Sequence, residues 1–335
     1  MNKIKLLGIT LILACLALPD SIAAAGVEIW LSPTQISPAN IGNNGAGSGT
    51  PADPFITPNA DTFFNLIHGL AVLDAQAGGT NAGLNAKYII PEYSTIHLMP
   101  GTFRVRDGTG LIPGQRFPLT PKDGWKIRGA GMDVTILKPI DEHLQPPVPK
   151  FAVISGAQGN NNSWEWCAND VEVSDLTVDC NMHNMPAVAV GNAINLSGSN
   201  NKISRVHAIN WGSRHDPGSE GECFVLNIDA HFNRPQTYQN NIIEECLVDR
   251  PAPMQHSWTT TAIGMGNQPD ATPQPVGPGW IIRNNVVKDI ATGNQFGQAS
   301  SLNAIGVGGF GLGPRKNFSV IWPGIKLRLG WGLGR

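Results

Sequence analysis

Four segments of the chain repeat one pattern of apolar positions. They are VEVSDLTVD from Val171, NKISRVHAI from Asn201, NIIEECLVD from Asn241 and WIIRNNVVK from Trp280. The matched columns are Val173, Ile203, Ile243 and Ile282; then Leu176, Val206, Cys246 and Asn285; then Val178, Ala208, Val248 and Val287. Residues of the first column follow one another at separations of 30, 40 and 39 positions. Periods of this length indicate a solenoid or an array.

The spacing inside each repeat predicts two short strands with a bend between them. The inward apolar residue recurs at a gap of three and then of two, whereas one straight strand would give two and two. A further strand precedes most units: NAINLSG at 192–198, CFVLNID at 223–229 and TTAIGMG at 260–266, each bounded by turn residues. No helical segment separates these strands, so the pattern predicts an all-β parallel β-helix. Asn284 and Asn285 fit the amide ladders found at corners of stacked strands.

The stretch WKIRGAGMDVTIL at 125–137 places Gly129 and Gly131 directly after an apolar strand. A dinucleotide-binding turn needs a third glycine and then a helix whose N-terminal N–H groups face the phosphates. Val134 stands where that glycine would be, and VTILKP is a second β-branched strand that stops at Pro139. The stretch therefore predicts strand, tight turn and strand, as an early rung of the same solenoid.

One helix is predicted before the first rung, over residues 59–79. Phe63 and Ile67 begin a helical spacing that continues through Leu70, Ala71 and Asp74, Asn59 or Asp61 can cap its start, and Gly78-Gly79 can end it. An open solenoid end presents unpaired backbone and apolar side chains. We therefore expect this helix to be a structural cap.

Three phrases near the N-terminus carry a family resemblance. EIWLSP with GTPADPF, STIHLMPGTFRV and WKIRGAGMDVTIL are similar to the opening, the first rung and the next rung of the pectin-lyase-like superfamily. This resemblance covers residues 27 to about 290. It implies one right-handed parallel β-helix domain, which we place at 26–310.

The resemblance does not specify an activity. Many members of the superfamily are polysaccharide lyases or glycoside hydrolases, whereas others are adhesins or tailspikes, and a fold alone does not define function. The adjacent Asp-Asp, Gly-His-Gly and Arg-x-Lys motifs of polygalacturonase-like hydrolases do not occur in the sequence. RPAPMQ, from Arg250, lacks both the spacing and the second arginine of the Arg-x-Pro-x-x-Arg motif of pectate-lyase-like enzymes.

The N-terminus predicts export. Lys3 and Lys5 precede an apolar run at 6–18, and Ala23-Ala24-Ala25 offers a cleavage site, which is typical of a signal peptide over residues 1–25. Lipidation at Cys15 is an alternative, but the LALP that follows it stays apolar. We expect a secreted protein, extracellular or periplasmic.

Export changes the interpretation of the cysteines. In an oxidising compartment Cys167, Cys180, Cys223 and Cys246 could form two disulfides in any of three pairings. A buried free thiol is an equally good interpretation of Cys246, because it lies in an apolar column.

Composition and charge limit the kinds of partner that the protein is expected to bind. The formal net charge is −2 and no basic patch is present, so we expect no nucleic-acid partner. No stretch after the N-terminus is apolar enough to span a membrane. The chain is expected to act as a monomer on a polysaccharide.

Loops that leave the sheet after the third column gather the residues that could carry chemistry. They are DCNMHNMP, INWGSRHDPGSEGE and DRPAPMQHSW. Neighbouring rungs are roughly 4.8 Å apart, so we expect these loops at one edge, where aromatic rings beside titratable groups suit a sugar. The candidate catalytic residues are Asp179, His215, Asp216, Asp249 and Arg250, and the candidate substrate-binding residues are His183, Trp211, Arg214, His256 and Trp258.

Two mechanisms fit these residues. In a uronate lyase a His, Lys or Arg removes the proton α to the carboxylate, while a cation or Arg stabilises the developing charge. No cofactor is required, although Asp179, Asp216 and Asp249 could hold Ca²⁺ for that purpose. In a hydrolase two carboxylates act as acid and as base or nucleophile.

Other interpretations of these residues stay open. Asp179 and Asp249 each follow a Val at a strand end, where Asp often serves only as a turn residue. RHDPGSEGE can be a plain solvated loop. A non-catalytic β-helix that binds surfaces or glycans is therefore the alternative to an enzyme.

Residues 311–335 form an atypical tail. They are basic and rich in Gly and Trp, and they continue no rung. Two explanations stay open: truncation or a frameshift relative to a longer β-helix, or a segment that folds over the open end.

Overall fold

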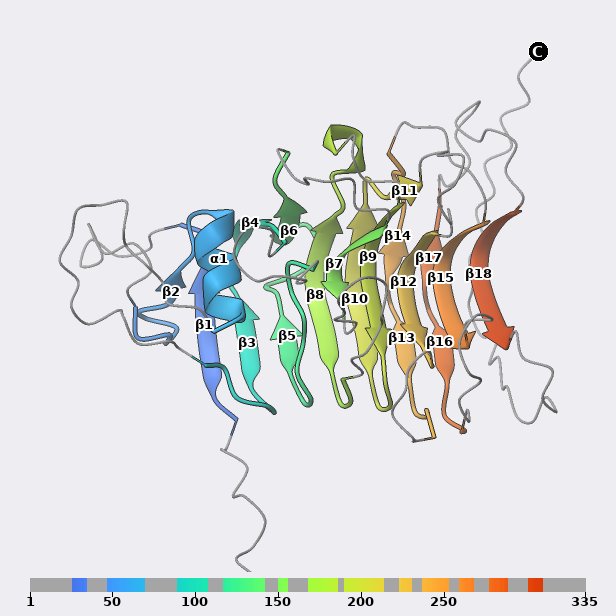
Figure 1. Cartoon of the computed structure of the whole chain (residues 1–335), viewed down its shortest axis with the longest axis horizontal. Coiled ribbons are helices and arrows are strands. Elements are labelled where there is room, and N and C mark those ends of the chain that lie inside the picture. The colour runs from blue at the N-terminus through green and yellow to red at the C-terminus, as the bar shows by residue number, and fades with distance from the viewer. Residues whose placement is uncertain are drawn as a thin grey trace, which may run out of the picture.

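The strands of this chain stack in two sheets, and nearly all of them pair in parallel (Figure 1). The computed structural model describes residues 26–34, 47–69, 89–107, 117–141, 150–155, 168–185, 190–213, 223–230, 237–252, 259–267, 277–288 and 301–309. Within these ranges no helix is long and apolar enough to cross a membrane. The predicted signal peptide and the tail from residue 311 lie outside them.

The first sheet has twelve strands among the described residues. They are β1 (Glu28–Ser32), β2 (Phe55–Ile56), β3 (Thr95–Leu98), β4 (Gly101–Val105), β5 (Lys126–Arg128), β6 (Thr135–Pro139), β8 (Glu172–Asp179), β10 (Lys202–Ile209), β13 (Ile242–Glu244), β14 (Leu247–Val248), β16 (Ile281–Arg283) and β17 (Val286–Val287).

The second sheet has six strands in the same ranges. They are β7 (Lys150–Ser155), β9 (Val190–Ser197), β11 (Gly212–Ser213), β12 (Cys223–Asp229), β15 (Thr259–Asn267) and β18 (Ser301–Gly309). All pair in parallel except β11, which runs antiparallel to β9. The chain alternates between the sheets, as β8, β9, β10, β12 and β13 illustrate. The predicted all-β parallel β-helix is therefore confirmed.

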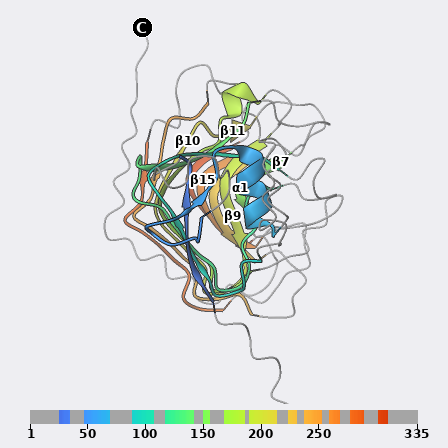
Figure 2. The ribbon, with the colours of Figure 1, turned by 90° about the vertical axis from the view of Figure 1, so that its left-hand side faces the viewer.

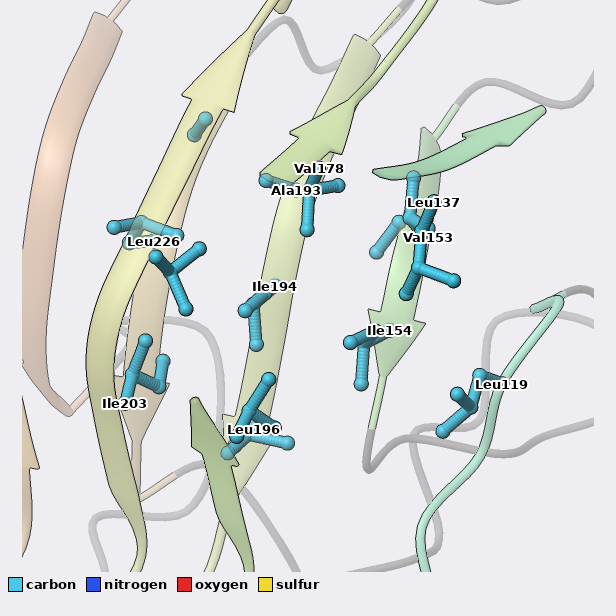
Figure 3. Packing of buried hydrophobic residues seen from close by; sticks show 14 of the residues in the cluster. Leu119, Leu137, Val153, Ile154, Val178, Ala193, Ile194, Leu196, Ile203 and Leu226 are labelled. Carbon is cyan, nitrogen blue, oxygen red and sulfur yellow. The ribbon is translucent and has the colours of Figure 1, made fainter. Parts of the chain in front are cut away.

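Residues in the same apolar column of the sequence repeat pair with one another in the first sheet. Ile203 pairs with Val173 on one side and with Ile243 on the other, and Ile243 pairs with Ile282. The third column continues in the same way, through Ala208 and Val248. Side chains from both sheets meet in one buried core (Figure 3). Each fully buried Ile, Leu or Val contributes about 1.5–3 kcal/mol.

The predicted bend inside each unit is a single residue in the left-handed conformation. Asp175, Arg205, Glu245 and Asn284 have φ values of 59°, 49°, 56° and 55° and lie in matching positions of successive rungs. A strand that takes this conformation at one residue turns its direction and shifts its alternation. The gap of three between inward residues follows from it.

Amide ladders occur, but at a different corner from the one predicted. Asn240 donates a side-chain hydrogen bond to Asn200, and Asn200 donates one to Asp170. At the predicted position, Asn285 is buried and bonds the backbone instead: its Oδ1 accepts from the N–H of Cys246, and its amide donates to the carbonyl of Ile243. The prediction of stacked amides was therefore wrong for Asn285.

A helix covers the N-terminal end of the solenoid. Helix α1 (Ala60–Ile67) begins after Asn59, whose side chain accepts the N–H of Thr62. The end-on view shows α1 on the side of the second sheet (Figure 2), and its Phe63 packs edge-on against Phe103 of β4. The helix is shorter than predicted, because it ends at Ile67 and Gly69 takes a φ of 67°. Residues 70–79 lie outside the described ranges.

Three cysteines are free and buried, namely Cys180, Cys223 and Cys246. Burial raises the pKa of the Cys223 and Cys246 thiols to about 12. The alternative of two disulfides was therefore wrong, and the free-thiol interpretation of Cys246 is confirmed. Cys167 lies outside the described residues.

Candidate functional site

The predicted edge exists where β8, β10 and β14 end. Ile209 pairs with Asp179, and the pair formed by Ala208 and Val248 places Asp249 on the other side of Ile209. Asp179 and Asp249 are therefore two rungs apart, roughly 10 Å by the strand spacing. Along this line Lys138 contacts Asp179 and Lys288 contacts Asp249, each at 3.2 Å.

An imidazole lies between two carboxylates at this edge. His207, on the outward side of β10, has its Nε2 2.7 Å from Asp249 Oδ1 and its Nδ1 2.8 Å from Asp133 Oδ1. Arg250 lies beside them, with Nε 3.2 Å from Asp249 Oδ1 and Nη2 3.1 Å from His207 Nε2. We call Asp133, His207, Asp249, Arg250 and Lys288 the edge cluster.

Exposure divides the edge cluster into two layers. The side chains of His207 and Asp249 are only 3% and 6% exposed, whereas those of Asp133 and Arg250 are 65% and 55% exposed. A solute can therefore touch the outer carboxylate and the guanidinium, but not the imidazole beneath them.

Asp249 stays ionised in this setting. Burial alone raises the pKa of its carboxyl, but the hydrogen bonds from His207 and Arg250 outweigh burial, and the pKa lies below its usual value. An ionised Asp249 is an acceptor only, so the short contact to His207 requires a proton on Nε2. The second ring nitrogen then faces Asp133, and a proton can be exchanged between these two groups.

Asp179 has a different role from Asp249. Its Oδ1 accepts the backbone N–H of Asn181, two residues further along the chain, and also a side-chain N–H of Asn210. This is the local bond by which an aspartate forms a turn. The turn-residue interpretation of Asp179 is supported, whereas Asp249 bonds a distant strand.

Trp211 was expected to bind substrate, and the structure contradicts this expectation. Its side chain is fully buried in the core, and its indole N–H donates to the carbonyl of Asp249. A ring without an exposed face has no surface on which a sugar can stack. Trp211 instead anchors the turn that carries Asp249 and Arg250. His183 lies exposed on a short 3₁₀ helix, η2 (Met182–Asn184).

The remaining predicted site residues lie outside the described part of the chain. They are Arg214, His215, Asp216, His256 and Trp258. Of the three predicted calcium ligands, Asp216 is among these residues outside the described ranges. Asp179 and Asp249 are described, and each contacts a lysine. Within the described ranges, no group of three or more His, Cys, Asp or Glu side chains could hold a metal ion.

Sequence reasoning missed His207 and Asp133. His207 stands within the repeat, at an outward position that Thr177, Leu247 and Val286 occupy in the neighbouring rungs. A histidine in a row of the repeat that otherwise carries only apolar or hydroxyl side chains is a signal that could have identified His207 from the sequence. Asp133 gave no such signal, because it lies 74 residues before His207 in sequence, inside a glycine turn.

Comparisons with known proteins add little to this geometry. No family model matches the chain, and no curated protein does. Among solved structures the chain is similar to the A-module of the mannuronan C-5 epimerase AlgE6 of Azotobacter vinelandii, at 17% identity and a TM-score of 0.33. The match covers 58% of this chain and 48% of that one. A similarity this weak supports no inference about activity, and membership of the pectin-lyase-like superfamily is not established by it.

Proposed function

We propose that the protein is a carbohydrate-active enzyme that acts on an acidic polysaccharide at the edge cluster. The observation that carries the proposal is His207, held between two carboxylates and beside a half-exposed arginine. Such an arrangement supplies a group that exchanges protons and a cation that can bind an anion, on a regular surface that a polymer can follow.

Elimination suits this cluster better than hydrolysis. In a uronate the proton to be removed is α to a carboxylate, and a guanidinium bound to that carboxylate stabilises the charge that develops. Arg250 is exposed enough to bind it, and Lys288, with a side chain 40% exposed, adds positive charge nearby. A hydrolase that used Asp179 and Asp249 would need both carboxylates in contact with the sugar, yet their side chains are 9% and 6% exposed and each contacts a lysine.

A secreted location agrees with such a substrate, because a polysaccharide lies outside the cell. The signal peptide predicted over residues 1–25 would place the enzyme there. Calcium assistance remains part of the proposal, through Asp216.

Non-catalytic glycan binding is the second candidate. The observation in its favour is that the described charged groups of the edge cluster already contact one another, so the cluster can also serve as a stabilising network. Arg250 and Lys288 would then bind the acidic polymer without any proton transfer.

A product assay separates these candidates. The mature protein is incubated with uronate and neutral polysaccharides, with Ca²⁺ or with a chelator, while unsaturated products and new reducing ends are followed separately. We expect unsaturated products from a uronate polymer and a loss of at least 100-fold in the His207→Gln and Arg250→Gln variants. The matched control is Arg205→Gln, which also removes an arginine from this face of the sheet. Arg205 lies at the bend, outside the edge cluster, and pairs with Asp175.

Each other outcome has a meaning. Reducing ends without unsaturation would replace elimination by hydrolysis. Retention on glycan affinity gels without any product would favour the binding protein. Equal activity in His207→Gln and Arg205→Gln would place the chemistry elsewhere on the chain.

A further inference from the structure

The glycine turn of the early rung is longer than the bend of any neighbouring rung in the described first sheet. Arg128 pairs with Ser174 and Ile136 pairs with Thr177, so residues 129–135 stand where β8 has only Asp175 and Leu176. Five extra residues are thus inserted at a position where β8 and β10 bend at one residue. An insertion at one rung of a regular solenoid often carries function.

The turn is built to lie close against the rung beside it. Gly129 and Gly131 donate their N–H groups to the carbonyls of Ser174 and Asp175. A Cβ at Gly129 would lie 2.2 Å from the Asp175 carbonyl oxygen, and Gly131 has a φ of 147°. Glycine is therefore required at both positions. The two glycines that suggest a nucleotide site in the sequence instead hold the turn against β8.

The same turn delivers Asp133 to the edge cluster. Asp133 has a φ of 63°, and its N–H donates to Thr177 Oγ1 at 2.8 Å. Thr177 Oγ1 in turn donates to Asp133 Oδ1 at 3.2 Å, so one buried hydroxyl fixes both the backbone and the carboxylate. Asp133 thereby reaches across β8 to His207 on β10.

We propose that Asp133 is the catalytic residue that exchanges the proton with the substrate, and that Thr177 is the residue that positions it. This assignment rests on the proposed function. Asp133 is the exposed member of the line Asp133–His207–Asp249, and His207 is too deeply buried to reach a sugar. His207 and Asp249 orient its carboxylate from below.

The step is an elimination. Ionised Asp133 takes the proton from the sugar carbon next to the uronate carboxylate, and the electron pair of that C–H bond becomes a carbon–carbon double bond. The bond to the leaving glycosidic oxygen breaks, and that oxygen takes a proton from water. The hydroxide left behind takes the proton from Asp133, which is then ionised again. Arg250 faces the uronate carboxylate throughout.

Two measurements test the assignment separately. In protein labelled with ¹⁵N at histidine, the Nδ1 resonance of His207 reports its hydrogen bond to Asp133, and the Nε2 resonance reports the bond to Asp249. We expect Asp133→Asn and Thr177→Val to shift Nδ1 while Nε2 stays within its wild-type range, and Thr177→Ser to restore Nδ1. Asp170→Asn is the matched control, since Asp170 is another exposed aspartate with a positive φ, of 59°.

The second measurement is kinetic, on the uronate polymer that gives product. We expect Asp133→Asn to lower kcat by 100-fold or more, Thr177→Val to lower it about 10-fold, and Thr177→Ser and Asp170→Asn to stay within about twofold, with KM unchanged in all. An Asp133→Asn variant with wild-type kcat would overturn the catalytic role, and an Nδ1 resonance indifferent to Thr177→Val would overturn the positioning role. Absence of product from the wild-type protein would overturn the proposed function itself, and the Nδ1 resonance would still decide whether Thr177 positions Asp133.

Discussion

Two clusters of charge lie on the outer face of the first sheet, on either side of the bend. In the first, Glu244 accepts from Lys202 at 2.7 Å and from Arg283 Nε at 2.7 Å. In the second, the edge cluster, Asp249 lies between Lys288 and Arg250. Both place one buried carboxylate between two partly exposed cations. We call the first the ion ladder, by its residues Lys202, Glu244 and Arg283.

The difference between them is an imidazole and an inserted turn. The ion ladder joins successive rungs through Lys202, Glu244 and Arg283 alone, and these three residues include neither an imidazole nor a second carboxylate. The edge cluster has His207 in the row where its neighbours carry Thr177 and Leu247, and it has Asp133 delivered from another rung. A stabilising motif of the solenoid becomes a candidate proton-exchange site through these two local changes.

The largest expected effect tests the register on which the comparison depends. Ile243 is fully buried, whereas its neighbour Ile242 points outward and pairs with Lys202. Ile243→Asp would bury an unpaired carboxylate, which costs several kcal/mol against a total stability of about 5–15 kcal/mol. We expect it to abolish soluble folding, and Ile242→Asp to leave a folded protein, as judged by expression and circular dichroism. Equal behaviour of the two variants would mean that the inward and outward faces are assigned wrongly.

The same alternation of inward and outward residues explains which parts of this fold could be predicted from the sequence. The columns through Ile203, Ile243 and Val178 could be found because their side chains face one continuous core, which forces a fixed period on the chain. The edge could be found as well, because parallel strands of equal length end together. Asp249 and Arg250 were located in this way.

The rest could not be found, because it depends on contacts between distant rungs. Trp211 looks like a surface aromatic in sequence, yet its ring fills the core, and only packing decides between the two. Asp133 reads as a turn residue, and its meeting with His207 depends on a hydroxyl of a third strand. No periodicity records such a meeting.

The second expected effect compares the carboxylates directly. Asp249→Ala leaves His207, with a 3% exposed side chain, without the acceptor of its Nε2 proton, so we expect a loss of about 2–3 kcal/mol in the free energy of unfolding. Glu244→Ala frees Lys202 and Arg283, whose side chains are 35% and 48% exposed and can turn to water, so we expect a loss of about 1 kcal/mol. Urea denaturation at neutral pH measures both. Losses of the same size would show that the edge cluster is only a second ion ladder.

The smallest expected effect is a pH dependence of stability that arises from His68. The imidazole of His68 faces a backbone carbonyl, whereas that of His207 faces two carboxylates. His68 follows α1, its ring packs at a tilt against Phe64, and its Nε2 lies 3.1 Å from the Pro118 carbonyl oxygen. Burial lowers its pKa from 6.5 to about 4, and the bond to Pro118 only partly opposes this. The unfolded chain therefore binds a proton on this residue at a higher pH than the folded chain does. His68 contributes full stability above pH 6.5 and loses it as the pH falls toward 4.

The shift corresponds to roughly 3 kcal/mol at its limit, of which about 2 kcal/mol is lost between pH 7 and pH 5. His68→Phe keeps an aromatic ring against Phe64 but cannot titrate, so its free energy of unfolding should fall by about 2 kcal/mol less over that interval than that of the wild type. The comparison is made by urea denaturation of both proteins at the two pH values. An equal fall in the free energy of unfolding of both proteins would mean that His68 does not cause the loss of stability in acid. A smaller fall in the variant would show that an imidazole held by a carbonyl destabilises this fold in acid.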